Sequence, residues 1–393
     1  MIKDGTRMKR WITFGMSQYR TPGFSDTSRQ MTQAFVGPKA YVEPPKPFSS
    51  WRTLDGTVVN WTVQQEGQTD ILVPPLPIPS KLDLFRTGLK WQARRLDQVL
   101  RNRWGSAWRD ETIVYVTNWT PQFQPLIQRL GPKHLVFDVV DDVLSFPYGF
   151  QRDRVLSSWR QLAAQASVVT TVSKHLQRKS VEELQVAAVH VLPNGVDADR
   201  FMNPTGRRPI EFDEPQSTVR VGFAGTLNHW IDFQSIQTLA RSFPHVSFYF
   251  MGRIGHFGSS ATEQAYEDAF SEPNVHYMGT VDYDELPDVL HQMDILLLPR
   301  KLNDASAASN PLKLYEYLAV GKPIVTSGVP IPDDMVPYVY AVKDGSGIVR
   351  AFEQALSECD SPSEALTKAR QNIALQNTWR HRVDEMVQLC MNH

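Results

Sequence analysis

A lysine and a glutamate that open one short predicted helix, Lys313 and Glu316, are the residues best placed to do chemistry. Pro311 suits the first helical position because its missing N–H would have no partner there, and Ser309 or Asn310 can cap the turn. Lys313 and Glu316 are three residues apart, so they share one face near the positive end of the helix. A helix N-terminus with a lysine beside it binds a diphosphate, and a glutamate one turn later can accept hydrogen bonds from a ribose. The pattern therefore predicts a nucleotide site.

The residues that follow predict how this helix is held. Gly321 can take the left-handed conformation that ends a helix, and Pro323 prevents its continuation before the apolar strand Ile324–Ser327. Leu314 and Leu318 are four residues apart and can pack the helix onto a sheet. The alternative interpretation of the same residues is an ordinary surface helix of an α/β domain.

The sequence from Ser309 to Ser327 resembles the GT-B glycosyltransferases of the retaining, family-4-like kind, also called glycosyl transferases group 1. That family has a proline-rich approach, a helix with a glutamate and a Gly-Lys-Pro-hydrophobic strand in the same order. The resemblance implies that Lys313 binds the diphosphate of a nucleotide-sugar donor and that Glu316 binds its ribose. It also assigns donor contacts to the residues that open the helix, Asn310, Pro311 and Leu312.

One position departs from the family pattern. Family members often carry two glutamates separated by seven residues, and the place of the first is Ala308 in this sequence. In the family the first carboxylate usually contacts the donor sugar. Its loss leaves the identity of the sugar open.

Length and composition limit the classes of function. The 393 residues suffice for two domains of ordinary size, and a formal net charge of -1 gives no field that would attract nucleic acid. Two cysteines cannot build a disulfide framework, which favours a reducing compartment. No stretch approaches the roughly 20 apolar residues that span a bilayer. We therefore expect a cytoplasmic protein that can still rest, as a peripheral protein, on the inner face of the plasma membrane.

Apolar runs alternate with helical patterns along the whole chain, which is typical of parallel sheets covered by helices. The predicted strands are 11–16, 40–42, 71–73, 112–117, 134–140, 167–172, 189–192, 219–224, 246–251, 275–278, 294–298, 324–327 and 339–342. The predicted helices are 84–103, 152–166, 173–183, 233–242, 262–270, 283–292, 311–320 and 371–390. Together with the resemblance, this alternation predicts an α/β protein of GT-B architecture, with two doubly wound Rossmann-like domains facing an interdomain cleft.

A turn that contains Asn194 and Gly195 marks the predicted domain boundary, because Asn-Gly is a strong turn signal and a polar stretch follows it. We predict an acceptor-side domain over residues 1–195 and a domain that binds the nucleotide sugar over residues 196–370. Members of the resembled family return a C-terminal helix to the first domain, and the resemblance assigns that role to residues 371–393.

Further donor contacts are expected at the carboxyl ends of strands in the second half, where open α/β sheets bind ligands. Gly225 would let a phosphate approach the backbone closely, and Thr226 follows it. Arg253 can neutralise phosphate charge or be an ordinary surface residue, and Arg300 can contact a phosphate or the donor sugar. The turn that resembles the family's base-contacting turn contains Gly279 and Val281.

On the acceptor side, Asp141 and Asp142 follow the predicted strand 134–140, which directs them toward the expected cleft. They can orient an acceptor hydroxyl or a developing positive charge, and we choose Asp142 for acceptor handling; a solvated loop is the alternative. Asn118 and Trp119 end the preceding strand and can form a wall for a sugar ring or only a packed corner. No metal site is expected, because these aspartates lack companion ligands.

A basic stretch runs from Lys81 to Arg109 and includes the predicted helix 84–103. The residues that would form the core face of this helix are Leu89, Ala93, Leu96 and Leu100. Beside them lies a basic stripe of Arg86, Lys90, Arg94 and Arg101, with Trp91 roughly opposite the core. Basic residues beside exposed aromatic rings suit an anionic membrane surface that holds a lipid-linked acceptor, and a solvated helix is the alternative.

Together with these observations, the resemblance implies a metal-independent hexosyltransferase that needs no cofactor and takes a UDP- or GDP-linked sugar as donor. It passes the sugar to a glycan or lipid-linked acceptor with retention, and family analogy places the reaction in cell-surface polysaccharide synthesis. In this hypothesis Lys313 and Arg300 stabilise the departing diphosphate, Glu316 holds the nucleoside and Asp142 handles the acceptor. Two other classes stay open. One is a non-catalytic nucleotide- or glycan-binding protein of an assembly complex, favoured by Ala308, and the other is a nucleotide-sugar epimerase.

Overall fold

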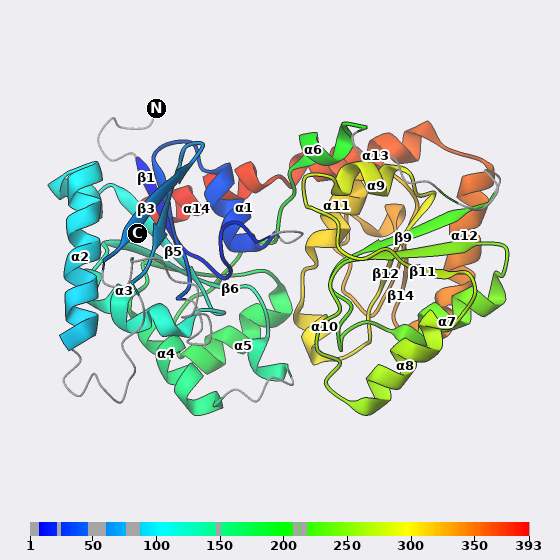
Figure 1. The fold of residues 1–393 in the computed structure, drawn as a ribbon, viewed down its shortest axis with the longest axis horizontal. Coiled ribbons are helices and arrows are strands. Elements are labelled where there is room, and N and C mark those ends of the chain that lie inside the picture. Colours follow the sequence, from blue (N-terminus) through cyan, green and yellow to red (C-terminus); the bar gives the residue numbers. More distant parts are fainter. Residues whose placement is uncertain are drawn as a thin grey trace.

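Two sheets dominate the computed structural model, which describes residues 8–21, 25–45, 60–75, 87–146, 151–206, 212 and 218–392. The sheets are separate and lie in two lobes arranged along the long axis of the molecule, each lobe with helices packed around its strands (Figure 1). All described strand pairs are parallel except one at the edge of the first sheet. The predicted α/β class with two doubly wound domains is confirmed.

The first sheet has the strand order β3-β4-β2-β1-β5-β6-β7-β8. Its strands are β1 (Arg10–Phe14), β2 (Lys39–Val42), β3 (Thr62–Glu66), β4 (Thr69–Val73), β5 (Thr112–Thr117), β6 (His134–Val139), β7 (Val168–Thr171) and β8 (His190–Val191). The helices around it are α1 (Thr27–Ala34), α2 (Thr87–Trp104), α3 (Gln124–Leu130), α4 (Arg152–Gln165) and α5 (Lys174–Leu184). Alternate strand residues enter two cores, so Val114 and Val116 pack on one face while Trp11 and Tyr115 pack on the other. Burial on both faces explains the nearly continuous apolar runs.

Strand β3 is an antiparallel edge strand that no apolar pattern predicts. Its five residues are Thr-Val-Gln-Gln-Glu, and the three in the middle are exposed. A polar edge of this kind discourages pairing with other chains, which is why its sequence does not resemble that of the buried strands.

The second sheet has the strand order β11-β10-β9-β12-β13-β14. Its strands are β9 (Arg220–Ala224), β10 (Ser247–Met251), β11 (Val275–Tyr277), β12 (Ile295–Pro299), β13 (Ile324–Ser327) and β14 (Tyr340–Val342). The helices that accompany it are α6 (Ala198–Met202), α7 (Phe233–Ser242), α8 (Ser260–Phe270), α9 (Leu286–His291), α10 (Asp304–Ala308), α11 (Leu312–Val320), α12 (Ile348–Asp360) and α13 (Glu364–Gln376). One further helix, α14 (Trp379–Met391), ends the described chain.

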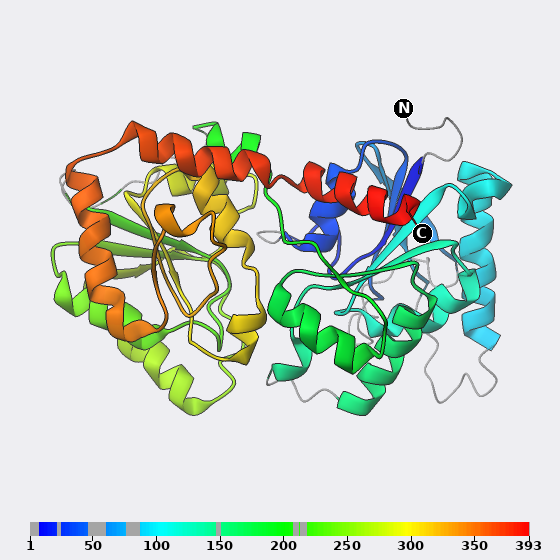
Figure 2. The same cartoon turned by 180° about the vertical axis from the view of Figure 1, so that it is seen from behind.

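The chain crosses between the two lobes twice, and the crossings touch (Figure 2). Val196 in the first crossing donates its N–H to the Asn377 carbonyl at 3.0 Å, and the Trp379 N–H donates to the Val196 carbonyl at 3.2 Å. A Cβ atom on Gly195 would stand 2.8 Å from the Trp379 nitrogen, a distance that side chains do not tolerate. The glycine of the predicted turn therefore permits the close approach of the two crossings.

The helix predicted over residues 371–390 is interrupted. Helix α13 ends at Gln376, and Thr378 caps α14 by accepting a hydrogen bond from the His381 N–H. Helix α13 packs against α11 in the second lobe, whereas α14 packs against α1 and enters a core of the first sheet (Figure 2). The interruption occurs because one straight helix could not serve both cores, and the predicted boundary at residue 371 lies inside α13.

Candidate active site

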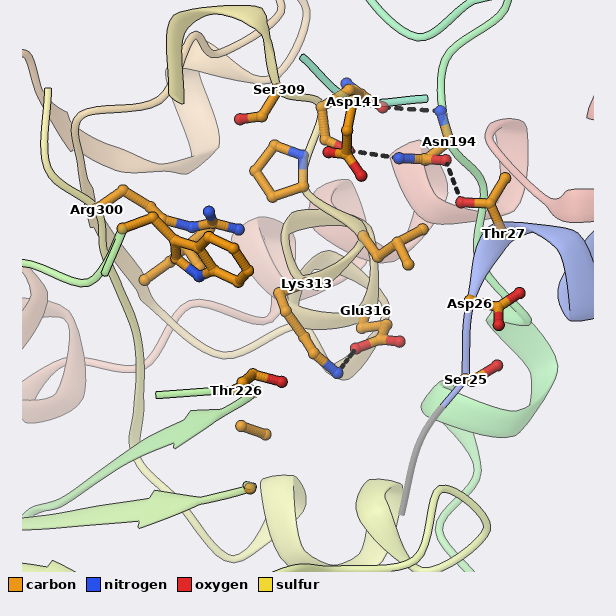
Figure 3. A pocket seen from close by; sticks show the side chains of 18 of the residues that line it. Ser25, Asp26, Thr27, Asp141, Asn194, Thr226, Arg300, Ser309, Lys313 and Glu316 are labelled. Carbon is orange, nitrogen blue, oxygen red and sulfur yellow. Dashed lines mark hydrogen bonds and ion pairs between the residues drawn. The ribbon is translucent and has the colours of Figure 1, made fainter. Parts of the chain in front are cut away.

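A cavity of about 280 Å³ opens between the two lobes (Figure 3). The first lobe contributes the segment after β6 and the start of α1, and the second contributes the turns after β9, β10 and β12 and the start of α11. Most of these segments follow the carboxyl ends of parallel strands, where ligands bind in such sheets. The predicted residues on its wall are Trp119, Asp141, Gly225, Thr226, Arg253, Val281, Arg300, Asn310, Pro311, Leu312, Lys313 and Glu316. Three predicted residues do not line it: Asn118, Asp142 and Gly279.

Helix α11 begins one residue later than predicted. Pro311 is the capping residue rather than the first helical residue, and no side chain caps the turn. The Asn310 amide, which was expected to cap, instead donates to the Tyr315 hydroxyl at 3.0 Å and accepts from the Asn194 N–H at 2.7 Å. Because the first backbone N–H groups of a helix have no partner inside it, this end of α11 presents donors toward the cavity. An uncapped N-terminus of this kind favours an anion.

Lys313 and Glu316 lie on one face of α11, as their spacing predicts. The Lys313 Nζ is 2.8 Å from the Glu316 Oε2, and the side chains are 24% and 5% exposed (Figure 3). On its other side, Glu316 lies close to Tyr283, where burial first and the nearby carboxylate second raise the pKa of the hydroxyl well above its usual range. The glutamate is thus held between a cation and a neutral hydroxyl.

Arg300 directly follows β12, and its guanidinium points into the cavity (Figure 3). Its Cζ lies 5.2 Å from the ring centroid of Trp230, a cation–π geometry. The Nε atom is buried and makes no hydrogen bond with any described residue. Burial lowers the pKa of Arg300 to about 10, while Asp141 and Tyr317 oppose the fall, so the side chain stays charged at neutral pH. Because the guanidinium is charged and has an N–H without a hydrogen-bond partner among the described residues, it can bind an anionic ligand.

Asp141 faces the cavity from the first lobe. Its Oδ2 accepts a hydrogen bond from the Trp119 Nε1 at 2.7 Å. Burial raises the pKa of the carboxyl to about 6, and the Trp119 hydrogen bond and the Arg300 charge limit the rise. Phe146 packs between Trp119 and Trp230, with ring centroids 5.6 Å and 5.7 Å away, and so joins the walls of the two lobes.

Asp142 and Asn118 have other partners. Asp142 is buried, pairs with the Lys179 Nζ at 2.6 Å and accepts from the Ser145 hydroxyl at 2.5 Å. The Asn118 amide donates to the Asp141 carbonyl at 2.7 Å and accepts from the Val140 N–H at 3.1 Å. Asp142 therefore starts the turn after β6, and Asn118 fixes the backbone that carries Asp141. Of the two aspartates, Asp141 lines the cavity and the Asp142 chosen from the sequence does not.

Two turns from neighbouring strands meet behind the donor side of the cavity. A Cβ on Gly252, whose φ is +138°, would lie 1.9 Å from the Gly225 carbonyl oxygen, so the close contact requires glycine. The Gly252 N–H donates to the Gly279 carbonyl at 2.7 Å. Gly279 thus supports the turn from behind, while Thr226, Val281 and the exposed Arg253 lie on the wall.

Several wall residues were missed by the sequence patterns. Ser25, Asp26 and Thr27 at the start of α1 face the cavity, as does Asn194 (Figure 3). Asp26 caps α1 by accepting from the Arg29 N–H at 2.9 Å. The polar run Ser-Asp-Thr-Ser was the available signal, since such residues mark the start of a helix.

Ala308 does not lie on the cavity wall. Its side chain is fully buried in a core of the first sheet, although its position in the chain belongs to the second lobe. The Ser173 hydroxyl, which caps α5, donates to the Ala308 carbonyl at 2.7 Å. The position that carries the first family glutamate is used here for packing between the lobes.

The described residues contain neither a cluster of metal-ligating side chains nor a membrane-spanning helix. No group of three or more histidine, cysteine, aspartate or glutamate side chains there is arranged to hold a metal ion. None of the helices in this part of the chain combines the length and the apolar character needed to cross a bilayer.

Part of the second lobe resembles a known protein family in sequence. Residues 218–358 match the family model of the glycosyl transferases group 1. A curated relative, the putative teichuronic acid biosynthesis glycosyltransferase TuaH of Bacillus subtilis (strain 168), is 27% identical over 236 residues. That match spans 58% of this chain and 58% of the relative. Residues 218–358 are therefore similar to the glycosyl transferases group 1.

Solved structures resemble the whole chain in fold. Sucrose-phosphate synthase from Thermosynechococcus elongatus has a TM-score of 0.72 at 12% identity, covering 98% of this chain and 99% of its own. The trehalose-6-phosphate synthase OtsA has a TM-score of 0.67 at 10% identity, with coverage of 98% and 99%. Anabaena Alr3699/HepE in complex with UDP has a TM-score of 0.63 at 13% identity, with coverage of 98% and 100%. At these identities the likeness establishes the GT-B fold.

Proposed function

We propose that this chain, whose residues 218–358 are similar to the glycosyl transferases group 1, is a glycosyltransferase that moves a sugar from a nucleotide-sugar donor to a carbohydrate acceptor. One observation carries the proposal. The Arg300 Nε–H, which makes no hydrogen bond with any described residue, and the uncapped N-terminus of α11 lie at the same cavity. Together they suit an anion with several oxygens, such as the diphosphate of a nucleotide sugar. Proteins of the same fold include one in complex with UDP and one bound with UDP-2-fluoro glucose.

The donor would lie along the second lobe. Its diphosphate would accept hydrogen bonds from the α11 backbone and from Arg300, while Gly225 and Thr226 lie next to it. Lys313 is paired with Glu316 before the donor binds. A phosphate would draw the lysine away, which frees the glutamate to accept hydrogen bonds from the ribose.

The chemistry would depend on these cations rather than on a metal ion. As the bond between sugar and phosphate breaks, negative charge develops on the leaving diphosphate, and Arg300, Lys313 and the α11 dipole would stabilise it. The resemblance to retaining transferases supports retention at the anomeric carbon. The anomeric configuration of the product, read from proton coupling constants, tests this point.

Asp141 is the residue that we propose for the acceptor. Its carboxylate faces the cavity from the first lobe, and its raised pKa suits a group that takes up a proton as the acceptor hydroxyl attacks. Trp119, which holds this carboxylate, offers an aromatic face to a sugar ring.

The acceptor is proposed to be a glycan or a lipid-linked sugar of a cell-surface polysaccharide. The name of the relative supports this process, since it is assigned to teichuronic acid biosynthesis. Helix α2 supports contact with a membrane, because Lys90, Arg94 and Arg101 are exposed on it and the Arg95 guanidinium lies 5.7 Å from the Trp91 ring centroid. Residues 81–86, including Arg86, lie outside the described part.

A non-catalytic nucleotide-binding protein is the second candidate. The buried Ala308 favours it, because no carboxylate reaches the donor sugar from that position. This candidate predicts nucleotide binding without turnover of any donor.

Calorimetric titration of UDP and GDP into the parent protein tests the proposal. We expect saturable binding of at least one nucleotide, and we expect Arg300→Ala and Glu316→Ala to weaken it about tenfold or more, as expected for lost hydrogen bonds to charged groups. The matched control is Arg241→Ala, whose side chain is 64% exposed on α7 and pairs with Glu272.

Absence of binding by the parent protein, or equal binding by all variants, would contradict the proposed donor site. If the nucleotide binds but no UDP- or GDP-sugar is consumed with any acceptor, the non-catalytic candidate is correct.

A further inference from the structure

The donor-side segment from α10 to α11 is attached to the first lobe, although it belongs to the second lobe by sequence. The Ala308 side chain lies in a core of the first sheet, and its carbonyl accepts from the Ser173 hydroxyl at 2.7 Å. Leu312, the first residue of α11, packs against the other core of that sheet. The start of α11 is therefore placed by contacts with both lobes.

Asn194, in the first crossing between the lobes, makes the polar part of this attachment. Its N–H donates to the Asn310 side-chain oxygen at 2.7 Å, and its side-chain amide donates to the Asn310 carbonyl at 2.6 Å (Figure 3). Both bonds run in the same direction: Asn194 supplies the two donors and Asn310 the two acceptors. Because Asn194 is only 6% exposed, water cannot easily replace these bonds.

The remaining polar atoms of Asn194 are also used. Its side-chain oxygen accepts from the Thr27 hydroxyl at 3.2 Å, and its carbonyl accepts from the Arg382 Nε at 3.2 Å. Thr27 opens α1 and Arg382 lies in α14. One asparagine thus joins the start of α1, the crossing, α14 and, through Asn310, the start of α11.

Asn310 connects Asn194 to helix α11. Its side-chain amide donates to the Tyr315 hydroxyl at 3.0 Å, and Tyr315 is 1% exposed within α11. The next residue, Pro311, is the capping residue of α11. A displacement of Asn310 would therefore move the backbone N–H groups that face the cavity.

We propose that Asn194 is a positioning residue, which holds the start of α11 in the orientation that binds a nucleoside diphosphate and links that orientation to the first lobe. The inference rests on the proposed function, because it concerns the same donor site. Without the Asn194 side chain, the Asn310 carbonyl loses its amide donor and the Thr27 hydroxyl loses its acceptor, so the donor must order this segment as it binds.

The test compares UDP binding by the parent protein, Asn194→Ala and Asn194→Asp at a temperature where circular dichroism reports all of them folded. We expect both variants to bind UDP at least about tenfold more weakly, which is the effect of a few lost buried hydrogen bonds. Both variants keep the backbone N–H that donates to Asn310. Asn194→Asp also sets a carboxylate oxygen against the Asn310 carbonyl, so it tests the side-chain bond even if the alanine variant folds poorly. Hydrogen exchange of the amides of residues 309–316 should become faster in both.

Asn274→Ala is the matched control. The Asn274 amide donates to three carbonyls, those of Ala240, Phe243 and Val246, at 3.1, 3.2 and 2.9 Å. It precedes β11 and therefore lies at the amino-terminal edge of the second sheet, away from the cavity. We expect it to lower the melting temperature and to leave UDP affinity and the exchange of residues 309–316 unchanged.

The possible outcomes separate the two proposals. If the parent binds UDP and both Asn194 variants bind within twofold of it, Asn194 has only a structural role and the inference is wrong. If the parent binds neither UDP nor GDP, the proposed function fails and the inference fails with it.

Discussion

Arg300 of the second lobe and Asp141 of the first lobe carry opposite charges. Burial lowers the pKa of Arg300 and raises the pKa of Asp141. Each is held by a tryptophan: Trp230 lies under the guanidinium, and Trp119 donates to the carboxylate. The Arg300 Nε makes no hydrogen bond with any described residue, so part of the guanidinium is unused. Perturbed groups that converge on one cavity are typical of functional sites, because folding alone does not require such an arrangement.

The pH dependence of transfer should report Asp141. The carboxyl is protonated below its pKa of about 6, so a rate that needs the carboxylate should rise with pH through about 6 and then level off. Asp141→Asn should lower kcat/KM by roughly 100-fold or more and remove this rise. Steady-state rates of UDP release between pH 5 and 8 measure the effect.

Asp138 supplies the control for that profile. Its pKa is also raised to about 6 by burial, but it accepts from Tyr115 and Thr170 inside the first lobe and does not line the cavity. Asp138→Asn should keep the rise through about 6. A flat profile in this variant, or an unchanged profile in Asp141→Asn, would exclude the assigned role of Asp141.

At the scale of elements, most of the correct predictions came from the periodicity of apolar residues and from the spacing of the site residues. Nearly all buried strands were located, because each is an apolar run flanked by turn residues, and the shared face of Lys313 and Glu316 followed from helical geometry. The capping of α11 could not be predicted, since the partner of Asn310 is Asn194, which is distant in sequence. The strand β3 and the short helix α10 were missed because neither has an amphipathic pattern. The predicted helices also omitted α1, α3, α6 and α12.

The position of helix α10 also limits which side chains residue 308 can carry. Ala308→Glu would restore the family glutamate in sequence, but it would bury an unpaired carboxylate in the core of the first sheet. We expect a loss of about 3 kcal/mol or more in the free energy of unfolding, measured by urea denaturation, and no gain in donor binding.

The neighbouring Ala307→Glu is the control, because residue 307 is partly exposed and not on the cavity wall. Its effect should stay below about 1 kcal/mol, as is usual for surface substitutions. A stable Ala308→Glu protein that binds UDP-sugars more tightly would mean that this side chain reaches the donor after all.

At the scale of the whole molecule, the two-lobed architecture was predictable from the alternation of strands and helices together with the family resemblance, whereas the contact of the two crossings was not. That contact joins Val196 to Thr378, which no local pattern relates. Helix α2 lies on the outer side of the first lobe, far from the second lobe (Figure 1). No local sequence pattern predicts this placement either.

This placement of α2 predicts how the molecule would meet a membrane. Lys90→Glu with Arg94→Glu should weaken binding to vesicles that contain phosphatidylglycerol about 100-fold or more, since each basic residue near an anionic surface contributes about 1 kcal/mol. Co-sedimentation at low salt measures it. Lys343→Glu with Arg350→Glu makes the same change in net charge at exposed sites in the second lobe and should have little effect. Equal losses in both variants would mean that net charge, not α2, governs the contact.

The position of α14 also bears on how the protein forms during synthesis. The elements of the second sheet and its helices follow one another along the chain, so that lobe is complete once α13 has left the ribosome. The first lobe is not, because Trp379, Val383 and Met386 of α14 cover Trp11 and Tyr115. Until α14 emerges, the earlier-made lobe displays an unfinished apolar face, which is where premature association between nascent chains would begin.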